Sequence, residues 1–312
     1  MMSHINVQKS EKRSGNIRYL RNHWILYAML GLPVIFYFLF HYLPIPGVVI
    51  AFKDYNLFRG IRASEWVGLR YFKQAFGFKS FWMSVRNTMI LNVIGLVLGF
   101  PAPILLALML NELRNKAFKK VTQTVLYLPH FISWVIVGGM MYQLFASSGF
   151  VNTVIKALGR VPVPCLSSSG WWIFTYFIVG QWKNIGWNTI IYLSAMTGID
   201  SELYEAARVD GCSRFRMMFS ITLPCILDTV MIMLILAVGG LASIGFEQPY
   251  VMQNSVVMDV ADVISTYVYR VGLQQAKFGI GSAIGLFQSV INFILVISAN
   301  SISKRMTDKG IW

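Results

Sequence analysis

Six long runs of apolar residues recur along the chain, separated by shorter polar stretches. The runs cover residues 24–43, 88–110, 121–145, 171–196, 221–245 and 281–301. Each run has about the 20 residues that a helix needs to cross ~30 Å of hydrocarbon. The runs lack the alternating pattern of membrane β-strands. The pattern therefore predicts an all-α integral membrane protein with six transmembrane helices.

Lys and Arg residues are unevenly divided among the polar stretches. The two tails and the second and fourth loops hold fifteen of them, and the first, third and fifth loops hold eleven. Because Lys and Arg concentrate on the cytoplasmic side of membrane proteins, both termini are expected in the cytoplasm. The first loop runs against this rule, since it alone holds seven of the eleven.

Composition agrees with a membrane location and argues against other classes of protein. Hydrophobic residues make up 56% of the chain and charged residues 13%, whereas about 25% charged is typical of soluble domains. The net charge is +14, but the basic residues lie between apolar runs and form no single face for nucleic acid. Cys165, Cys212 and Cys225 lack the spacing of a zinc site, so no metal site is expected.

The fourth loop, residues 198–220, has the pattern of two short helices joined by a sharp turn. Asp200 or Ser201 can cap a first helix that ends at Val209. Gly211 supplies the conformation in which a helix stops, and a second short helix follows. The residues alone leave two interpretations open: a knob that fits a groove in another protein, or an amphipathic loop at the membrane interface.

This loop resembles the EAA signature of ABC importer permeases, E-A-A-x-x-x-G-x9-I-x-L-P. The matching positions are Glu205, Ala206, Ala207, Gly211, Ile221, Leu223 and Pro224. Asp210 resembles the Asp of the Asp-Gly pair that is common in carbohydrate members, while Cys212 replaces the usual Ala with a residue of similar size. The likeness extends over most of the chain and is closest to permeases for complex oligosaccharides such as aldouronates or rhamnogalacturonan fragments.

The resemblance implies a type I importer permease fold and a set of partners. The permease domain would cover residues 24–305, with the ATPase-coupling loop at 198–224 and cytoplasmic tails at 1–23 and 306–312. In the bacterial plasma membrane the chain would pair with a second homologous permease, dock on two ATPase subunits, and receive oligosaccharide from an extracellular solute-binding protein. The chain has no Gly-Lys dipeptide and hence no P-loop, so we expect ATP on the partners and no catalytic residue or cofactor here.

Polar residues inside the third and fourth apolar runs form a candidate substrate pathway. They are His130, Gln181, Trp182, Lys183, Asn184 and Trp187. At 1.5 Å per residue, Lys183 lies about 18 Å and His130 about 13 Å from the starts of their runs, near the midplane. These side chains could contact sugar hydroxyls, or they could bond one helix to another. Lys183 and the basic first loop could also favour the carboxylates of a uronate-containing substrate.

An ion-coupled secondary transporter of a small polar solute is the alternative function. Such a transporter would also carry polar residues at the midplane, but it has no use for the EAA loop. No internal repeat is visible in the sequence, so the inverted-repeat transporters gain no support.

Overall fold

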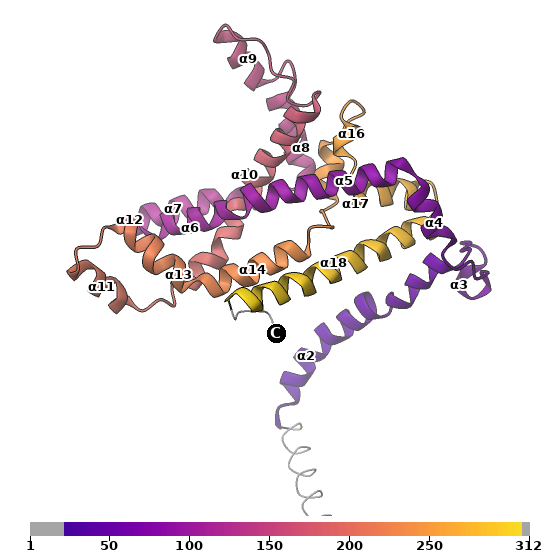
Figure 1. Cartoon of the computed structure of the whole chain (residues 1–312), viewed down its shortest axis with the longest axis horizontal. Helices are drawn as coiled ribbons and strands as arrows, with labels where there is room; N and C mark the ends of the chain where they lie inside the picture. The colour runs from indigo at the N-terminus through magenta and orange to yellow at the C-terminus, as the bar shows by residue number, and fades with distance from the viewer. Residues whose placement is uncertain (1–21, 308–312) are drawn as a thin grey trace, which may run out of the picture.

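The computed structural model describes residues 22–307, which form helices joined by short irregular segments (Figure 1). Within this range the only β-type pairing is an isolated bridge between Lys53 and Trp66. The all-α prediction is therefore confirmed for the described part of the chain. Most of the two predicted tails, residues 1–23 and 306–312, lies outside it.

Four helical stretches of the described chain are long and apolar enough to cross a membrane. They are Trp24–Phe52, Lys79–Asn111, Trp134–Ala157 and Phe278–Arg305. The segments Arg214–Cys225 and Leu227–Gly239 meet at 66° and make a fifth if the bent pair is one span. Six spans are thus not confirmed, because the fifth predicted run is bent and the fourth is not among these stretches.

The first stretch contains α2 (Trp24–Tyr37), and the second contains α5 (Lys79–Ile94) and α6 (Pro101–Asn111). The short helices α3 (Gly60–Ala63) and α4 (Arg70–Gly77) lie between the two stretches. α5 and α6 are joined by a π-helical turn, Gly95–Gly99, after which Pro101 takes the first helical position, where its missing N–H is tolerated. No described residue of α2 is buried. Such a continuous apolar surface belongs in lipid or against another apolar chain.

The third predicted run, residues 121–145, is broken into two helices and does not form the single transmembrane helix, kinked at Pro129, that the sequence predicts. α7 (Lys116–Tyr127) ends in a 3-10 turn, Leu128–Phe131, and α8 (Trp134–Phe145) starts after it. Pro129 in the turn has no N–H to continue the helical hydrogen bonds. Ser133 then takes an extended conformation and caps α8 by accepting a hydrogen bond from the Ile136 N–H at 3.4 Å.

The fourth predicted run forms one helix, α10 (Ser169–Met196), of 28 residues. At 1.5 Å per residue this helix is about 42 Å long, enough to cross a bilayer. It is nevertheless absent from the strongly apolar stretches because polar residues occupy its middle, including Gln181, Lys183 and Asn184. Length favours a span here, whereas composition alone does not.

The C-terminal half continues with short helices and one long one. These are α11 (Ser201–Val209), α12 (Arg214–Met217), α13 (Leu223–Cys225), α14 (Leu227–Gly239), α15 (Glu247–Met252), α16 (Met258–Ala261), α17 (Ile264–Val268) and α18 (Phe278–Thr307). α14 lies along α18, and α10 packs on α6 (Figure 1). The segment 240–246 between α14 and α15 is irregular, although it follows directly on an apolar helix.

Three apolar clusters hold these helices together. The first joins α8, α10 and α15 around Trp172, whose indole donates to the Met252 carbonyl at 2.9 Å. The second joins α4, α5, α17 and α18 around Phe81. The third joins α6 and α10 to the beginning of the fifth predicted run around Leu108. Because α10 contributes to the first and third clusters, its polar middle is held firmly between them.

Candidate functional site

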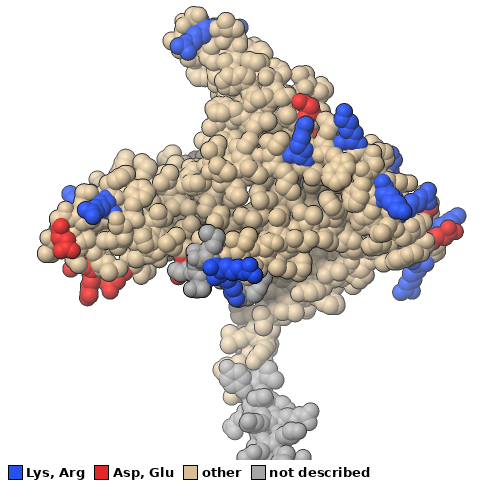
Figure 2. Space-filling model, viewed as in Figure 1, with Lys and Arg blue, Asp and Glu red and all other residues tan. Residues whose placement is uncertain are grey.

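The fourth loop, residues 198–220, forms the two capped helices that its sequence predicts; we call it the α11 loop. Asp200 caps α11, since its side chain accepts a hydrogen bond from the Glu202 N–H at 3.0 Å. Ser213 caps α12 by accepting from the Arg216 N–H at 3.4 Å. α11 contains no buried residue and lies at one end of the molecule (Figure 1). Acidic side chains gather at the same end in Figure 2. The loop is therefore an ordered projection.

Gly211 makes the sharp turn between the two helices. Its φ of +72° is in the left-handed region, which glycine adopts without steric cost. The Cys212 N–H donates to the Ala207 carbonyl at 2.8 Å, and the Gly211 N–H donates to the Arg208 carbonyl at 3.1 Å. This pair of bonds is the Schellman motif, which satisfies carbonyls at the end of a helix. The direction of α11 thus depends on the backbone conformation at residue 211.

The signature residues divide into an exposed group and a group that anchors the loop. The exposed group comprises Glu205, Ala206, Asp210, Gly211 and Pro224, whereas Ala207, Ile221 and Leu223 are half-buried. Leu223 packs against the third apolar cluster. The hydroxyl groups of Tyr204 and buried Thr222 lie 2.9 Å apart and tie α11 to this anchor. These contacts link α11 to the start of the fifth predicted run.

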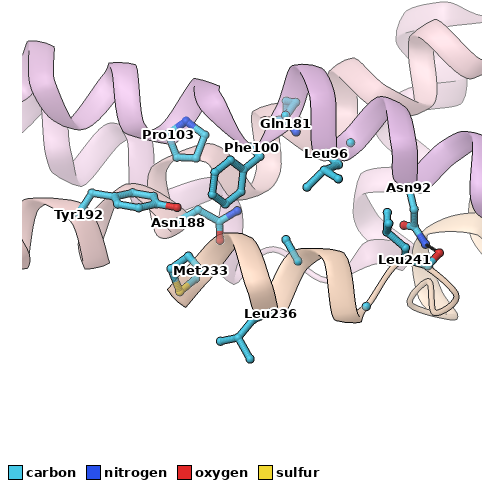
Figure 3. A pocket seen from close by; sticks show the side chains of 14 residues that line it. Asn92, Leu96, Phe100, Pro103, Gln181, Asn188, Tyr192, Met233, Leu236 and Leu241 are labelled. Atoms are coloured by element: carbon cyan, nitrogen blue, oxygen red, sulfur yellow. Dashed lines mark hydrogen bonds between the residues drawn. The ribbon is translucent and has the colours of Figure 1, made fainter. Parts of the chain in front are cut away.

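Three neighbouring cavities lie among α5, α6, α10, α14 and the segment after α14. Their volumes are about 330, 210 and 370 Å³. Asn92, Gln181 and Asn188 line both the first and the second cavity, and Asn184 and Gln248 line both the second and the third. Because neighbouring cavities share their walls, they form one series, which we call the amide path. Figure 3 shows the first cavity.

The amide path combines hydrogen-bonding and apolar groups. The amides of Gln181, Asn184 and Asn188 follow one another at spacings of three and four residues, which places them on one face of α10. In Figure 3 the opposite wall carries Met233 and Leu236, and Phe100 projects from α6's side. An amide both donates and accepts hydrogen bonds, so the path can bond a polar, uncharged surface without fixing its orientation.

Two of the six predicted pathway residues, Gln181 and Asn184, line the path directly. His130 stands behind Asn184, with 3.2 Å between its Nδ1 and the Asn184 Oδ1. The His130 ring stacks on Trp187, with ring centroids 4.5 Å apart and planes within 4°. Trp187 is 44% exposed and does not line the three cavities. His130 and Trp187 therefore support the wall of the path from behind.

Trp182 and Lys183 are not brought into the three cavities. Trp182 is 44% exposed and does not line them, which places its indole away from the path. Lys183 is 5% exposed, and its ammonium is engaged by backbone carbonyls of the turn between α7 and α8. In this structure the Lys183 ammonium therefore bonds to backbone carbonyls, and its electrostatic attraction for substrate carboxylates stays a prediction.

Sequence reasoning missed other amides that shape the path. Asn188 could have been found, because it continues the spacing of Gln181 and Asn184 on α10. Asn92 and Gln248 carry no such signal. Asn92 binds the irregular segment 240–246 by donating to the carbonyls of Leu241 at 2.7 Å and Ser243 at 2.9 Å. Gln288 and Asn292 of α18 bind the same segment at Ala242 and Ser243.

Replacing Asn92 by leucine is expected to lower the stability of the protein. The change removes both donors from carbonyls that lie at membrane depth, and each unsatisfied carbonyl costs about 1–3 kcal/mol. The thermal unfolding midpoint of the detergent-purified protein should fall. Asn188→Leu is the matched control, because in the described structure the Asn188 side chain makes no hydrogen bond. Equal midpoints for the two variants would contradict a role of Asn92 in holding the segment.

Comparison with a protein-family model gives a match over two thirds of the chain. Residues 99–308 match the model of the binding-protein-dependent transport system inner membrane component. The match includes the α11 loop and the walls contributed by α6, α10 and α14 to the amide path.

Similar proteins of known name and known structure cover nearly the whole chain. The polygalacturonan/rhamnogalacturonan transport system permease protein YteP of Bacillus subtilis is 41% identical over 307 residues, which are 98% of this chain and 96% of the relative. Protein LplB of the same organism is 43% identical over 295 residues, with 94% and 92% covered.

Two solved structures share the fold. A bacterial ABC transporter involved in the import of the acidic polysaccharide alginate matches with a TM-score of 0.83 at 38% identity and covers 93% of this chain and 98% of its own. A bacterial alginate ABC transporter in complex with an alginate pentasaccharide-bound periplasmic protein matches with a TM-score of 0.84 at 38% identity, covering 94% and 99%.

Proposed function

Because the chain belongs to the family of binding-protein-dependent transport system inner membrane components, we propose that it is a permease subunit of an ATP-driven ABC importer for oligosaccharides. Acidic, uronate-containing oligosaccharides are the preferred substrate class. This preference is supported by the names of the relatives, which refer to polygalacturonan and to the acidic polysaccharide alginate.

The amide path is the observation that carries this function. A sugar presents many hydroxyl groups, each of which donates and accepts, and carboxamides of Asn and Gln complement such groups without a net charge. Gln181, Asn184 and Asn188 provide these groups from α10, and Gln248 provides another from α15. Phe100 and Tyr192 add aromatic surface for the apolar faces of sugar rings. Each hydrogen bond between an amide and a sugar hydroxyl is weak, and the path offers several of them. The sugar can therefore move along the path without being held at one point.

The α11 loop is the proposed contact with the energy source. Its exposed helix, with Glu205, Ala206 and Asp210, would enter a groove of a separate ATPase subunit, while Ile221 and Leu223 anchor the loop to the helical bundle. The Tyr204 to Thr222 contact supports transmission between the two parts. ATP would be hydrolysed on two such ATPase subunits, and this chain is not itself an enzyme.

The complex would contain a second, homologous permease and an extracellular solute-binding protein. The chain exposes many large apolar side chains, and part of this surface would contact the second permease. A solved relative in complex with a pentasaccharide-bound periplasmic protein supports the delivery of substrate by a binding protein. We propose six spans with α10 as one of them and both termini in the cytoplasm of a bacterial cell. A topology reporter inserted between residues 147 and 168 should then be detected on the extracellular side of the membrane.

The decisive experiment is purification of this chain from its native membrane in mild detergent, followed by reconstitution into liposomes. We expect a second permease and a P-loop ATPase to copurify in near-equal amounts. With the binding protein added, uptake of a galacturonate pentasaccharide should require ATP and persist when ion gradients are collapsed. Uptake by the chain alone, driven by an ion gradient without ATP, would instead establish an ion-coupled secondary transporter.

A further inference from the structure

Lys183 lies in the middle of α10 and is enclosed by the break in the neighbouring helix. Its Nζ donates to the carbonyls of His130 at 2.6 Å, Ile132 at 2.6 Å and Pro129 at 3.3 Å. The ring centroid of Trp134, the first residue of α8, is 5.4 Å from the same atom. The three protons of an ammonium group thus meet three carbonyl groups of a single turn.

The break explains why an ammonium group is needed at this position. Between α7 and α8 the backbone leaves the helical path, so the His130 and Ile132 carbonyls accept no hydrogen bond from the N–H groups of a next helical turn. The Pro129 carbonyl accepts one from the Ile132 N–H at 3.2 Å. At membrane depth no bulk water replaces those bonds. Among the described residues the only ion pair joins Arg270 and Asp262, so Lys183 has no carboxylate within ion-pair distance. Carbonyl dipoles, the Trp134 ring and the more distant carboxylate of Glu247 stabilise its charge.

The same break supports two walls of the amide path. It carries His130, whose Nδ1 contacts Asn184, and it leads directly into Trp134. Asn184 and Trp134 both line the third cavity. Any change in the shape of the turn would therefore move a polar and an aromatic group at the cavity wall.

We infer that Lys183 is a positioning residue whose ammonium group holds the break at residues 128–133 and thereby sets Asn184 and Trp134 along the amide path. This inference rests on the proposed function for its transport readout. It assigns Lys183 hydrogen bonds to backbone carbonyls as its task, in place of an attraction for the carboxylates of the substrate.

Two neutral variants of Lys183 distinguish hydrogen bonding to the turn from attraction for the carboxylates of the substrate. Lys183→Met keeps an unbranched apolar side chain and removes both donors and charge, whereas Lys183→Gln removes the charge and keeps a donor group. In the reconstituted complex, Lys183→Met should lower Vmax for a galacturonate pentasaccharide by roughly tenfold or more, because carbonyls lose their partners. Lys183→Gln should retain more of the Vmax than Lys183→Met. KM should stay near the native value in both, because Lys183 itself makes no contact with the sugar.

A role of Lys183 in attracting the substrate would instead change KM. If Lys183 attracted the substrate, both variants would raise KM equally for the galacturonate pentasaccharide and leave KM for a neutral pentasaccharide unchanged. That outcome would overturn the positioning role. Thermal unfolding of both purified variants, measured beforehand, checks that each complex is folded.

A second readout is independent of transport. A nitroxide spin label on Phe131→Cys, with the three native cysteines replaced by alanine, reports the mobility of the turn in the detergent-purified complex. Its EPR line should narrow in Lys183→Met and stay close to native in Lys183→Gln. An unchanged line in Lys183→Met would overturn the inference. Failure of the native complex to take up oligosaccharide would instead overturn the proposed function and leave the EPR comparison valid.

Discussion

Replacing Gly211 by valine is expected to lower ATP-driven uptake by roughly tenfold or more, because a left-handed backbone costs an ordinary residue about 1–2 kcal/mol and a β-branched one is a strong outlier there. The φ of Gly211 is +72°, and a Cβ built on it meets nothing within 4 Å. The effect therefore arises from the backbone and not from a clash. Relief of the strain would break the two hydrogen bonds of the turn and redirect α11 away from its ATPase partner.

Two control variants test this reasoning. Gly159 has nearly the same φ, +71°, and the same open surroundings, but it lies in the loop after α9 (Phe150–Ala157). Gly159→Val should therefore impose the same local strain and leave copurification of the ATPase unchanged. Gly211→Asn should retain most of the uptake, since asparagine tolerates the left-handed region. Native uptake by Gly211→Val would show that the shape of this turn is unimportant for coupling.

The α11 loop could be predicted from the sequence because its structure depends on neighbours in the chain. Asp200 bonds to a backbone group two residues away, Ser213 to one three residues away, and Gly211 acts through its own φ. Capping and glycine rules describe interactions of this range. The predicted helix boundaries are confirmed for the same reason. The contact with an ATPase involves a second chain and stays a prediction.

The break between α7 and α8 and the partners of Lys183 could not be predicted in the same way. Pro129 was visible within the third run, but a proline inside a membrane helix can produce either a kink or a complete break. The outcome depends on donors from elsewhere, and here Lys183 supplies them from more than 50 residues along the chain. A hydropathy pattern locates the apolar run that contains Lys183, and the cost of a charge facing lipid places that side chain in the protein interior, as the structure shows. Neither argument contains information on a bond to such a distant part of the chain.

Replacing Gly95 by tryptophan is expected to abolish uptake while leaving the complex assembled. Gly95 lies where α5 meets the π-helical turn and lines both the first and the second cavity of the amide path. A Cβ built there meets nothing within 4 Å, so the indole can enter without displacing backbone. The first cavity has a volume of about 330 Å³, and a bulky rigid ring in it leaves no passage for a sugar.

Gly139→Trp is the matched control for the Gly95→Trp variant, whose indole would fill the first cavity. Gly139 is an exposed glycine of α8 with equally open surroundings, and it does not line the amide path. Both variants add the same apolar group to a helix, so loss of folding or insertion would affect them alike. Uptake of the pentasaccharide should disappear only in Gly95→Trp, while ATPase copurification stays native in both. Because the indole blocks the path without touching α11, ATP hydrolysis should continue in the Gly95→Trp complex. Normal uptake by that variant would place the route of the sugar outside the amide path.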